Sequence, residues 1–164
     1  MNVENKSLSY SRVTLSAALT ASIATALTLV IQLPIWVMFI GWISFFCSGL
    51  TSKKTLENLG CVWLGMLLGM LASFTIAKII PILGIQILMP IVVFCITLIV
   101  VSLRGIPILN NLLGYFLGLV TWFAAHYEPA WESISQLCFA TAIGSIAGWI
   151  SHHIPPKVFR NNTV

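Results

Sequence analysis

Acidic residues are scarce in this sequence. Aspartate is absent, and the four acidic residues are Glu4, Glu57, Glu128 and Glu132. Only 7% of the 164 residues are charged, whereas a soluble domain carries about 25%. With 59% hydrophobic residues, the chain cannot cover a globular surface with polar groups. We therefore expect an integral membrane protein whose main partner is the lipid bilayer.

The shortage of ionisable groups also excludes several kinds of chemistry. Proton relays and carboxylate cation sites in membranes use ionisable residues at mid-depth, and every glutamate here lies at or beyond the end of an apolar segment. No acid–base pair, nucleophile–base pair or metal-binding cluster is visible in the sequence. We expect no enzyme activity, no cofactor and no metal, and a membrane enzyme is the weakest hypothesis.

Histidine, cysteine and the basic residues do not change this expectation. His126 and the pair His152–His153 fall near helix ends, and adjacent side chains on a helix point about 100° apart, which does not suit one metal ion. The four cysteines lie in apolar runs without a C-x-x-C spacing, so no zinc site or disulfide framework is indicated. The eight Lys and Arg residues are scattered and form no patch for nucleic acid.

Six apolar segments fill most of the chain, and a membrane-spanning helix needs about 20 apolar residues. We predict six transmembrane helices at Val13–Leu33, Pro34–Gly49, Asn58–Ile79, Ile85–Leu103, Pro107–His126 and Ser135–Ile150. A polar segment, residues 1–12, precedes them. A polar tail, residues 155–164, begins at Pro155–Pro156, which we expect to end the last helix.

The basic residues predict the orientation of these helices. With six helices, both chain ends and the loops around Lys53 and Arg104 fall on one side of the membrane. That side holds seven of the eight Lys and Arg residues, and the other side holds only Lys78. Because Lys and Arg accumulate in cytoplasmic loops, we expect both termini to be cytoplasmic.

A short pattern recurs in the second and fifth predicted helices. Phe39, Gly41, Ser44 and Phe46 recur with identical spacing as Phe116, Gly118, Thr121 and Phe123. We call the separation from Phe39 to Phe116, which all four pairs share, the motif offset. Gly65 and Gly69 of the third helix recur as Gly144 and Gly148 of the sixth, and we call their slightly larger separation the glycine offset. The alternative is a chance recurrence, since Phe and Gly are common in this chain.

The recurrence divides the membrane region into two halves of three helices, residues 13–80 and 81–154. Three is an odd number, so the second half enters the membrane from the opposite face. The predicted fold class is therefore an all-α membrane protein with a 3+3 inverted repeat. Many transporters share this pattern and bind their substrates near the midplane, at the interface of the repeats. We expect the two motifs to face each other there.

The recurring motif supplies the candidates for a solute path, which are Phe39, Gly41, Ser44, Phe46, Phe116, Gly118, Thr121 and Phe123. We expect the phenylalanines to form an aromatic constriction, the two glycines to bring the second and fifth helices together, and the two hydroxyls to supply hydrogen bonds. The alternative for Ser44 and Thr121 is a hydroxyl bonded to the carbonyl four residues back. For Gln86, Asn110 and Asn111 the ordinary role is a hydrogen bond to a neighbouring helix.

Other glycines are spaced as in helix-packing faces. They are Gly65, Gly69, Gly114, Gly144 and Gly148. Because six short helices leave little room inside one chain, we expect a homo-oligomer that assembles through these glycine faces.

The motif residues also carry a resemblance. In its second and fifth predicted helices the chain resembles the bacterial family known as domain of unknown function 1097. The residues that carry this resemblance are Trp36, Phe39, Gly41, Phe45 and Phe46, followed by Gly114, Phe116, Gly118, Phe123 and Ala124. The similarity covers about Leu27 to Trp149. These are small polytopic proteins of the inner membrane, so the resemblance implies that location and a helical membrane fold. It implies no activity.

Two functions from different classes remain open. The leading hypothesis is a channel or facilitator for a small, mostly uncharged solute, because no charged group is expected at mid-depth. The alternative is a non-transporting scaffold or regulatory partner in the membrane, for which the repeat serves packing alone. A cavity that reaches Ser44 and Thr121 would favour the first hypothesis, and a closed core of Phe and Leu the second.

Overall fold

The computed structural model describes the backbone of residues 3–47 and 49–160, and the side chains of residues 11, 13–47 and 49–153. These described residues form six α-helices and no β-strand. The helices are α1 (Val3–Val30), α2 (Ile35–Phe46), α3 (Ser52–Leu83), α4 (Ile85–Leu103), α5 (Leu112–Ala125) and α6 (Trp131–Arg160). The predicted all-α fold with six helices is confirmed. Residues 161–164 of the predicted tail, and the side chains of Lys6, Arg12, Lys157 and Arg160, lie outside the described residues.

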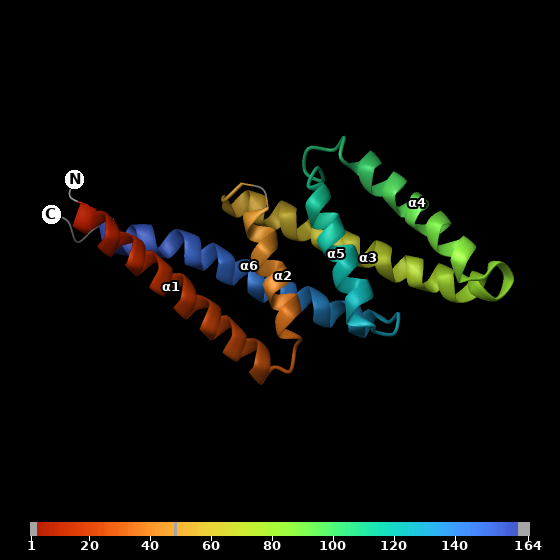
Figure 1. The fold of residues 1–164 in the computed structure, drawn as a ribbon, viewed down its shortest axis with the longest axis horizontal. Coiled ribbons are helices and arrows are strands. Elements are labelled where there is room, and N and C mark those ends of the chain that lie inside the picture. Colours follow the sequence, from red (N-terminus) through yellow and green to blue (C-terminus); the bar gives the residue numbers. More distant parts are fainter. Residues whose placement is uncertain (1–2, 48, 161–164) are drawn as a thin grey trace.

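Each short helix crosses a long helix from the other half of the sequence (Figure 1). α2 packs mainly on α6, and α5 packs mainly on α3. α1 lies beside α6, and α4 lies beside α3. The described chain therefore consists of two three-helix groups, which are joined mainly by the contacts of α3 with α6 and of α3 with α2.

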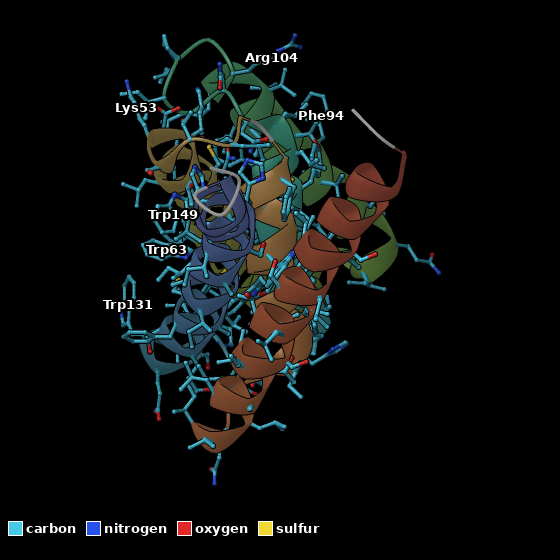
Figure 2. The ribbon with its side chains drawn as sticks, turned by 90° about the vertical axis from the view of Figure 1, so that its left-hand side faces the viewer. Lys53, Trp63, Phe94, Arg104, Trp131 and Trp149 are labelled. Carbon is cyan, nitrogen blue, oxygen red and sulfur yellow. The ribbon has the colours of Figure 1, made fainter. Side chains whose placement is uncertain are left out.

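The helix connections divide between two ends of the molecule. In Figure 1 the α2–α3 and α4–α5 connections lie at the top, and the α1–α2 and α5–α6 connections lie at the bottom. Figure 2 places Lys53 and Arg104 at one end and Trp131 toward the other. Basic residues that are far apart in the sequence thus share one end of the molecule.

α4 has the bounds that the sequence predicted, Ile85–Leu103. It is separated from α3 by Gly84, whose φ of +71° lies in the left-handed region. Glycine reaches this region without a steric cost, so Gly84 interrupts the helix where most residues would continue it.

The three longest helices extend beyond their predicted ends. α1 begins at Val3 instead of Val13. α3 begins at Ser52 because the Thr51 side chain accepts a hydrogen bond from the Lys54 backbone N–H at 3.3 Å, which caps the first turn. α3 continues past Pro81, and α6 continues past Pro155–Pro156. The prediction that Pro155–Pro156 ends the last helix is wrong, since the proline φ is compatible with a helix and each proline removes one backbone donor.

α2 and α5 are shorter than predicted. α2 follows Pro34, as expected, but ends at Phe46 instead of Gly49. α5 begins at Leu112 instead of Pro107 because the Asn111 side chain accepts a hydrogen bond from the Gly114 N–H at 3.1 Å. Asparagine favours this capping position over a helix interior.

Four of the described helices are long and apolar enough to cross a membrane. They are α1 over Val13–Val30, α3, α4, and α6 over Trp131–His153. α2 and α5 are apolar but have only 12 and 14 residues. Of the six predicted transmembrane helices, four therefore have the length of a full span.

The largest buried cluster lies where the two groups meet. It combines Val37 of α2, Met66 of α3, Trp122 of α5 and Leu137 of α6. Because these side chains come from both halves of the sequence, neither half completes this core alone.

Candidate functional site

Gly41 and Gly118, the glycines of the recurring motif, each lie against the backbone of a crossing helix. A Cβ on Gly41 would overlap the carbonyl oxygen of Thr141 on α6, and a Cβ on Gly118 would overlap that of Val62 on α3. Any other residue would force the backbones apart at these two positions. Close helix crossings of this kind depend on small residues.

The reciprocal contacts use glycines of the long helices. A Cβ on Gly144 would overlap the carbonyl oxygen of Met38 on α2, and a Cβ on Gly65 would overlap that of Tyr115 on α5. Each crossing is thus formed by two glycines that approach each other's helix backbone.

A third contact pairs glycine with an aromatic ring. Gly148 lies against Phe45, with 3.2 Å from a built Cβ to the Phe45 Cβ, and Gly69 lies against Trp122, with 2.9 Å to the Trp122 Cβ. In all three pairs of contacts, the α2 and α5 residues are related by the motif offset, and the α3 and α6 residues by the glycine offset. Each of these glycine contacts in one three-helix group therefore has a counterpart in the other group, at the positions given by the two offsets.

These contacts correct two expectations. Gly41 and Gly118 were expected to bring α2 and α5 together, but their closest neighbours lie on α6 and α3. Gly65, Gly144 and Gly148 pack within the chain, as do Gly69 and Gly114, the latter 2.9 Å from the Cys61 Cβ when a Cβ is built on it. The glycine faces are occupied inside one chain, which contradicts their expected use between subunits. A glycine spacing predicts a close helix contact but does not identify the partner helix.

Ser44 and Thr121 are fully buried. The Ser44 hydroxyl donates to the Gly41 carbonyl at 2.7 Å, and the Thr121 hydroxyl donates to the Leu117 carbonyl at 2.7 Å. Both side chains have 0% exposure. The alternative interpretation, a hydroxyl bonded within its own helix, therefore describes both residues, with a carbonyl three residues back for Ser44. Neither lines an open path in this structure.

The motif phenylalanines lie on the outside of the molecule. The exposed fractions are 40% for Phe39, 48% for Phe46, 40% for Phe116 and 39% for Phe123. Ile43 and Val120, one turn along each helix, are exposed as well. The expected aromatic constriction is therefore not formed within one chain. We call these six residues, on α2 and α5, the phenylalanine face.

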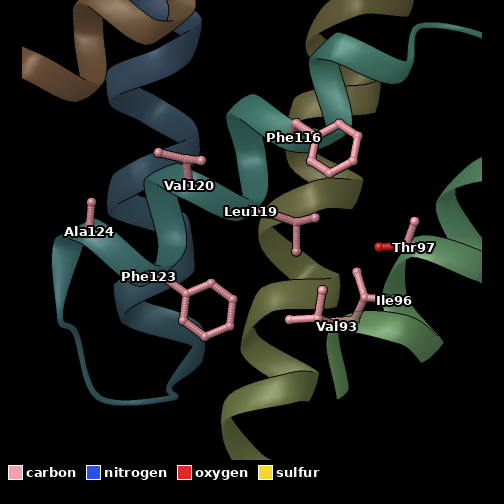
Figure 3. A pocket seen from close by; sticks show the side chains of 8 residues that line it. All are labelled: Val93, Ile96, Thr97, Phe116, Leu119, Val120, Phe123 and Ala124. Carbon is pink, nitrogen blue, oxygen red and sulfur yellow. The ribbon is translucent and has the colours of Figure 1, made fainter. Parts of the chain in front are cut away.

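An apolar cavity adjoins half of this face. It has a volume of about 500 Å³ and is lined by Val93, Ile96, Thr97, Phe116, Leu119, Val120, Phe123 and Ala124. Figure 3 shows Phe116 and Phe123 projecting from α5 on the side where α4 presents Val93, Ile96 and Thr97. The Thr97 hydroxyl is the one polar side-chain group in this lining, so the cavity suits an uncharged or apolar occupant.

A network of polar side chains connects α2, α3 and α5 near the end of the molecule where Lys53 and Arg104 lie (Figure 2). The Asn111 side chain donates to the Asn58 side chain at 2.9 Å, and Asn58 donates to the Ser44 carbonyl at 3.1 Å. Asn58 is buried. The interhelical role expected for Asn111 is confirmed, whereas Asn110 and Gln86 are exposed.

The sequence interpretation did not single out Asn58, which it took as a helix start. The one indication in the sequence was an amide between apolar positions, Leu56–Glu57–Asn58–Leu59. Its neighbour Glu57 pairs with Lys54, whose Nζ lies 2.6 Å from the Glu57 Oε2. The charged groups of this segment therefore stay at the end of the helix, while the neutral amide is buried.

Tryptophan side chains form further interhelical hydrogen bonds among the described residues. Trp63 donates to the Thr141 hydroxyl at 3.1 Å, and Trp122 donates to the Ser73 hydroxyl at 2.8 Å. Each bond connects α3 to a helix of the second half of the sequence. Indole N–H groups usually find a partner when buried, and here the partners fix α3 against α6 and α5.

The histidine pair belongs to an aromatic cluster at the end of α6. His153 stacks on Trp149 with ring centroids 4.9 Å apart, and His152 lies 5.9 Å from the Phe45 ring. Among the described residues, no group of three His, Cys, Asp or Glu side chains could hold a metal ion. These histidines therefore serve packing in this structure.

One comparison with known proteins identifies relatives. A family model described as "Protein of unknown function (DUF1097)" matches residues 14–155, which is most of the chain. Searches of the curated proteins and of the solved structures found no match.

Proposed function

We propose, from the premise that the chain belongs to the DUF1097 family, that it is an integral protein of the bacterial inner membrane with both termini in the cytoplasm. The described apolar helices support this location, because only lipid can surround so many exposed apolar side chains. The Lys and Arg bias supports the orientation. A reporter fused after Val164 should be active only in the cytoplasm, and activity only outside it would reject the orientation.

We further propose that the two halves of the chain are an inverted repeat. The support is the set of three glycine contacts that recur under the motif offset and the glycine offset. A chance likeness of two apolar segments does not account for matching contacts to matching partner positions. In this arrangement α3 and α6 are exchanged, so that each half completes the packing of the other.

For the activity, we propose a channel or facilitator for a small, mostly uncharged solute, with its path along the phenylalanine face. The supporting observation is that the four motif phenylalanines are exposed while the other motif positions on the same two helices are buried. The exposed residues are Phe39, Phe46, Phe116 and Phe123. The buried residues are Gly41, Ser44, Gly118 and Thr121. The uncharged cavity beside Phe116 and Phe123 favours a neutral solute.

Solute flux into liposomes tests this proposal. The purified full chain is reconstituted, and entry of glycerol and urea is followed by light scattering. We expect flux above that of empty liposomes, and a change in flux when Phe116 and Phe123 are replaced by alanine. The matched control is Phe139→Ala, because Phe139 is an exposed phenylalanine of α6 outside the cavity. Equal flux with and without protein would reject transport of these solutes.

One observation favours the second candidate function, a non-transporting scaffold or regulatory partner. Ser44 and Thr121 lie in a closed interior, as that hypothesis predicts. A scaffold would give no flux, and replacement of the phenylalanines would then weaken binding of a partner without an effect on permeability.

A further inference from the structure

The two helices of the phenylalanine face are too short to cross the membrane. α2 has 12 residues and α5 has 14, so they extend about 18 and 21 Å at 1.5 Å per residue. The hydrocarbon core is about 30 Å thick. In the membrane proposed above, the ends of these two helices would fall short of the hydrocarbon boundary, where backbone that leaves a helix is tolerated only if protein covers it. Oligomerisation is one of the ways in which a short apolar helix meets this mismatch.

The same face lacks cover within the chain. In Figure 1, α2 and α5 lie between α1 and α4, and the six side chains of the phenylalanine face remain exposed. The face carries no charged residue. The other candidate face for association, formed by the glycines, is already occupied inside the chain.

We propose that a second copy of this chain covers the phenylalanine face, with α2 of each copy against α5 of the other. This inference rests on the membrane location and orientation proposed above. Because the Lys and Arg bias gives every copy the same orientation, the two copies are related by a two-fold axis along the membrane normal, which is the usual symmetry of a dimer.

The direction of the helices fixes the pairing. α2 and α5 run in opposite directions between the two ends of the molecule. Under this axis, Ile43 of one copy lies opposite Val120 of the other, at the centre of the contact. Phe39 then lies near the second copy's Phe123, and Phe46 near its Phe116.

This dimer deepens the proposed function. It brings the four recurring phenylalanines of each copy together between the copies, so the aromatic constriction expected from the sequence is formed at the subunit interface. The solute path would then run between two chains, and one chain alone would be inactive.

Disulfide cross-linking between two differently tagged full-length chains tests the dimer. The native cysteines are replaced by alanine; one chain carries Ile43→Cys and the other Val120→Cys. A disulfide requires Cα atoms within about 7 Å, so we expect about tenfold more mixed dimer than from Ile43→Cys with Phe139→Cys. Phe139 is an exposed apolar residue of α6 outside the proposed contact. The mass of the unmodified protein in detergent should correspond to two chains.

The outcomes separate this inference from the proposed function. The dimer would be rejected if the protein in detergent had the mass of one chain, since lipid would then cover the phenylalanine face. Equal cross-linking by the Phe139 control would also reject the dimer. Flux without the dimer would leave transport standing and reject the interface. The specific cross-link without flux would support the interface and reject transport.

Discussion

The carbonyl oxygen of Val62 occupies the position that a Cβ on Gly118 would require. Thr141 and Gly41 have the same relationship in the other three-helix group. In each case two helix backbones touch, so neither contact can be relieved by rotation of a side chain.

Replacement of these glycines should therefore destabilise the fold. Gly41→Ala and Gly118→Ala should each lower the free energy of unfolding by about 1–3 kcal/mol, because overpacking forces backbone shifts. Denaturation of the purified protein in detergent measures this loss.

Gly60→Ala is the matched control. Gly60 lies in α3, and a Cβ built there has no neighbour within 4 Å. Alanine should stabilise the helix at this position by about 0.5–1 kcal/mol relative to glycine. Equal stability of all three variants would contradict the close helix crossings.

Loss of Asn58 should disrupt the junction of α2, α3 and α5. Asn58→Ala removes the bonds to the Ser44 carbonyl and to Asn111 and leaves the Asn111 side-chain amide without this acceptor, at a cost of about 1–3 kcal/mol. Asn110→Ala, an exposed amide of the same segment, should change stability by less than about 0.5 kcal/mol. Thermal unfolding of both variants distinguishes the two positions, and similar losses would argue against the network.

The bond from Trp122 to Ser73 should show energetic coupling. A double-mutant cycle with Trp122→Phe and Ser73→Ala should give a coupling of about 0.6 kcal/mol, as is typical of hydrogen bonds between membrane helices. Ser102 provides a control, since its hydroxyl is exposed and bonds within its own helix. If the losses in free energy of unfolding for Trp122→Phe and Ser73→Ala simply add in the double variant, the bond between these side chains is excluded.

The local features of this chain and its all-α class could be predicted from the amino-acid sequence alone. Hydrophobic runs, prolines and glycines indicated six helices, and α4 was placed at its observed bounds. The residues of the motifs led to the DUF1097 family, which the family comparison shows. The motif offset and the glycine offset were also visible before any contact was known. These features follow from backbone preferences and spacing along the chain, which depend little on distant residues.

Tertiary structure decided which side of each helix is buried. A helix of a soluble protein marks its buried side by a contrast between apolar and polar faces, but α2 and α5 are apolar all round. The motif phenylalanines were therefore expected inside and are exposed, whereas Phe45, Ser44 and Thr121 are buried. Only the crossing of α2 with α6 and of α5 with α3 decided this, because a glycine permits backbone contact that a larger side chain prevents.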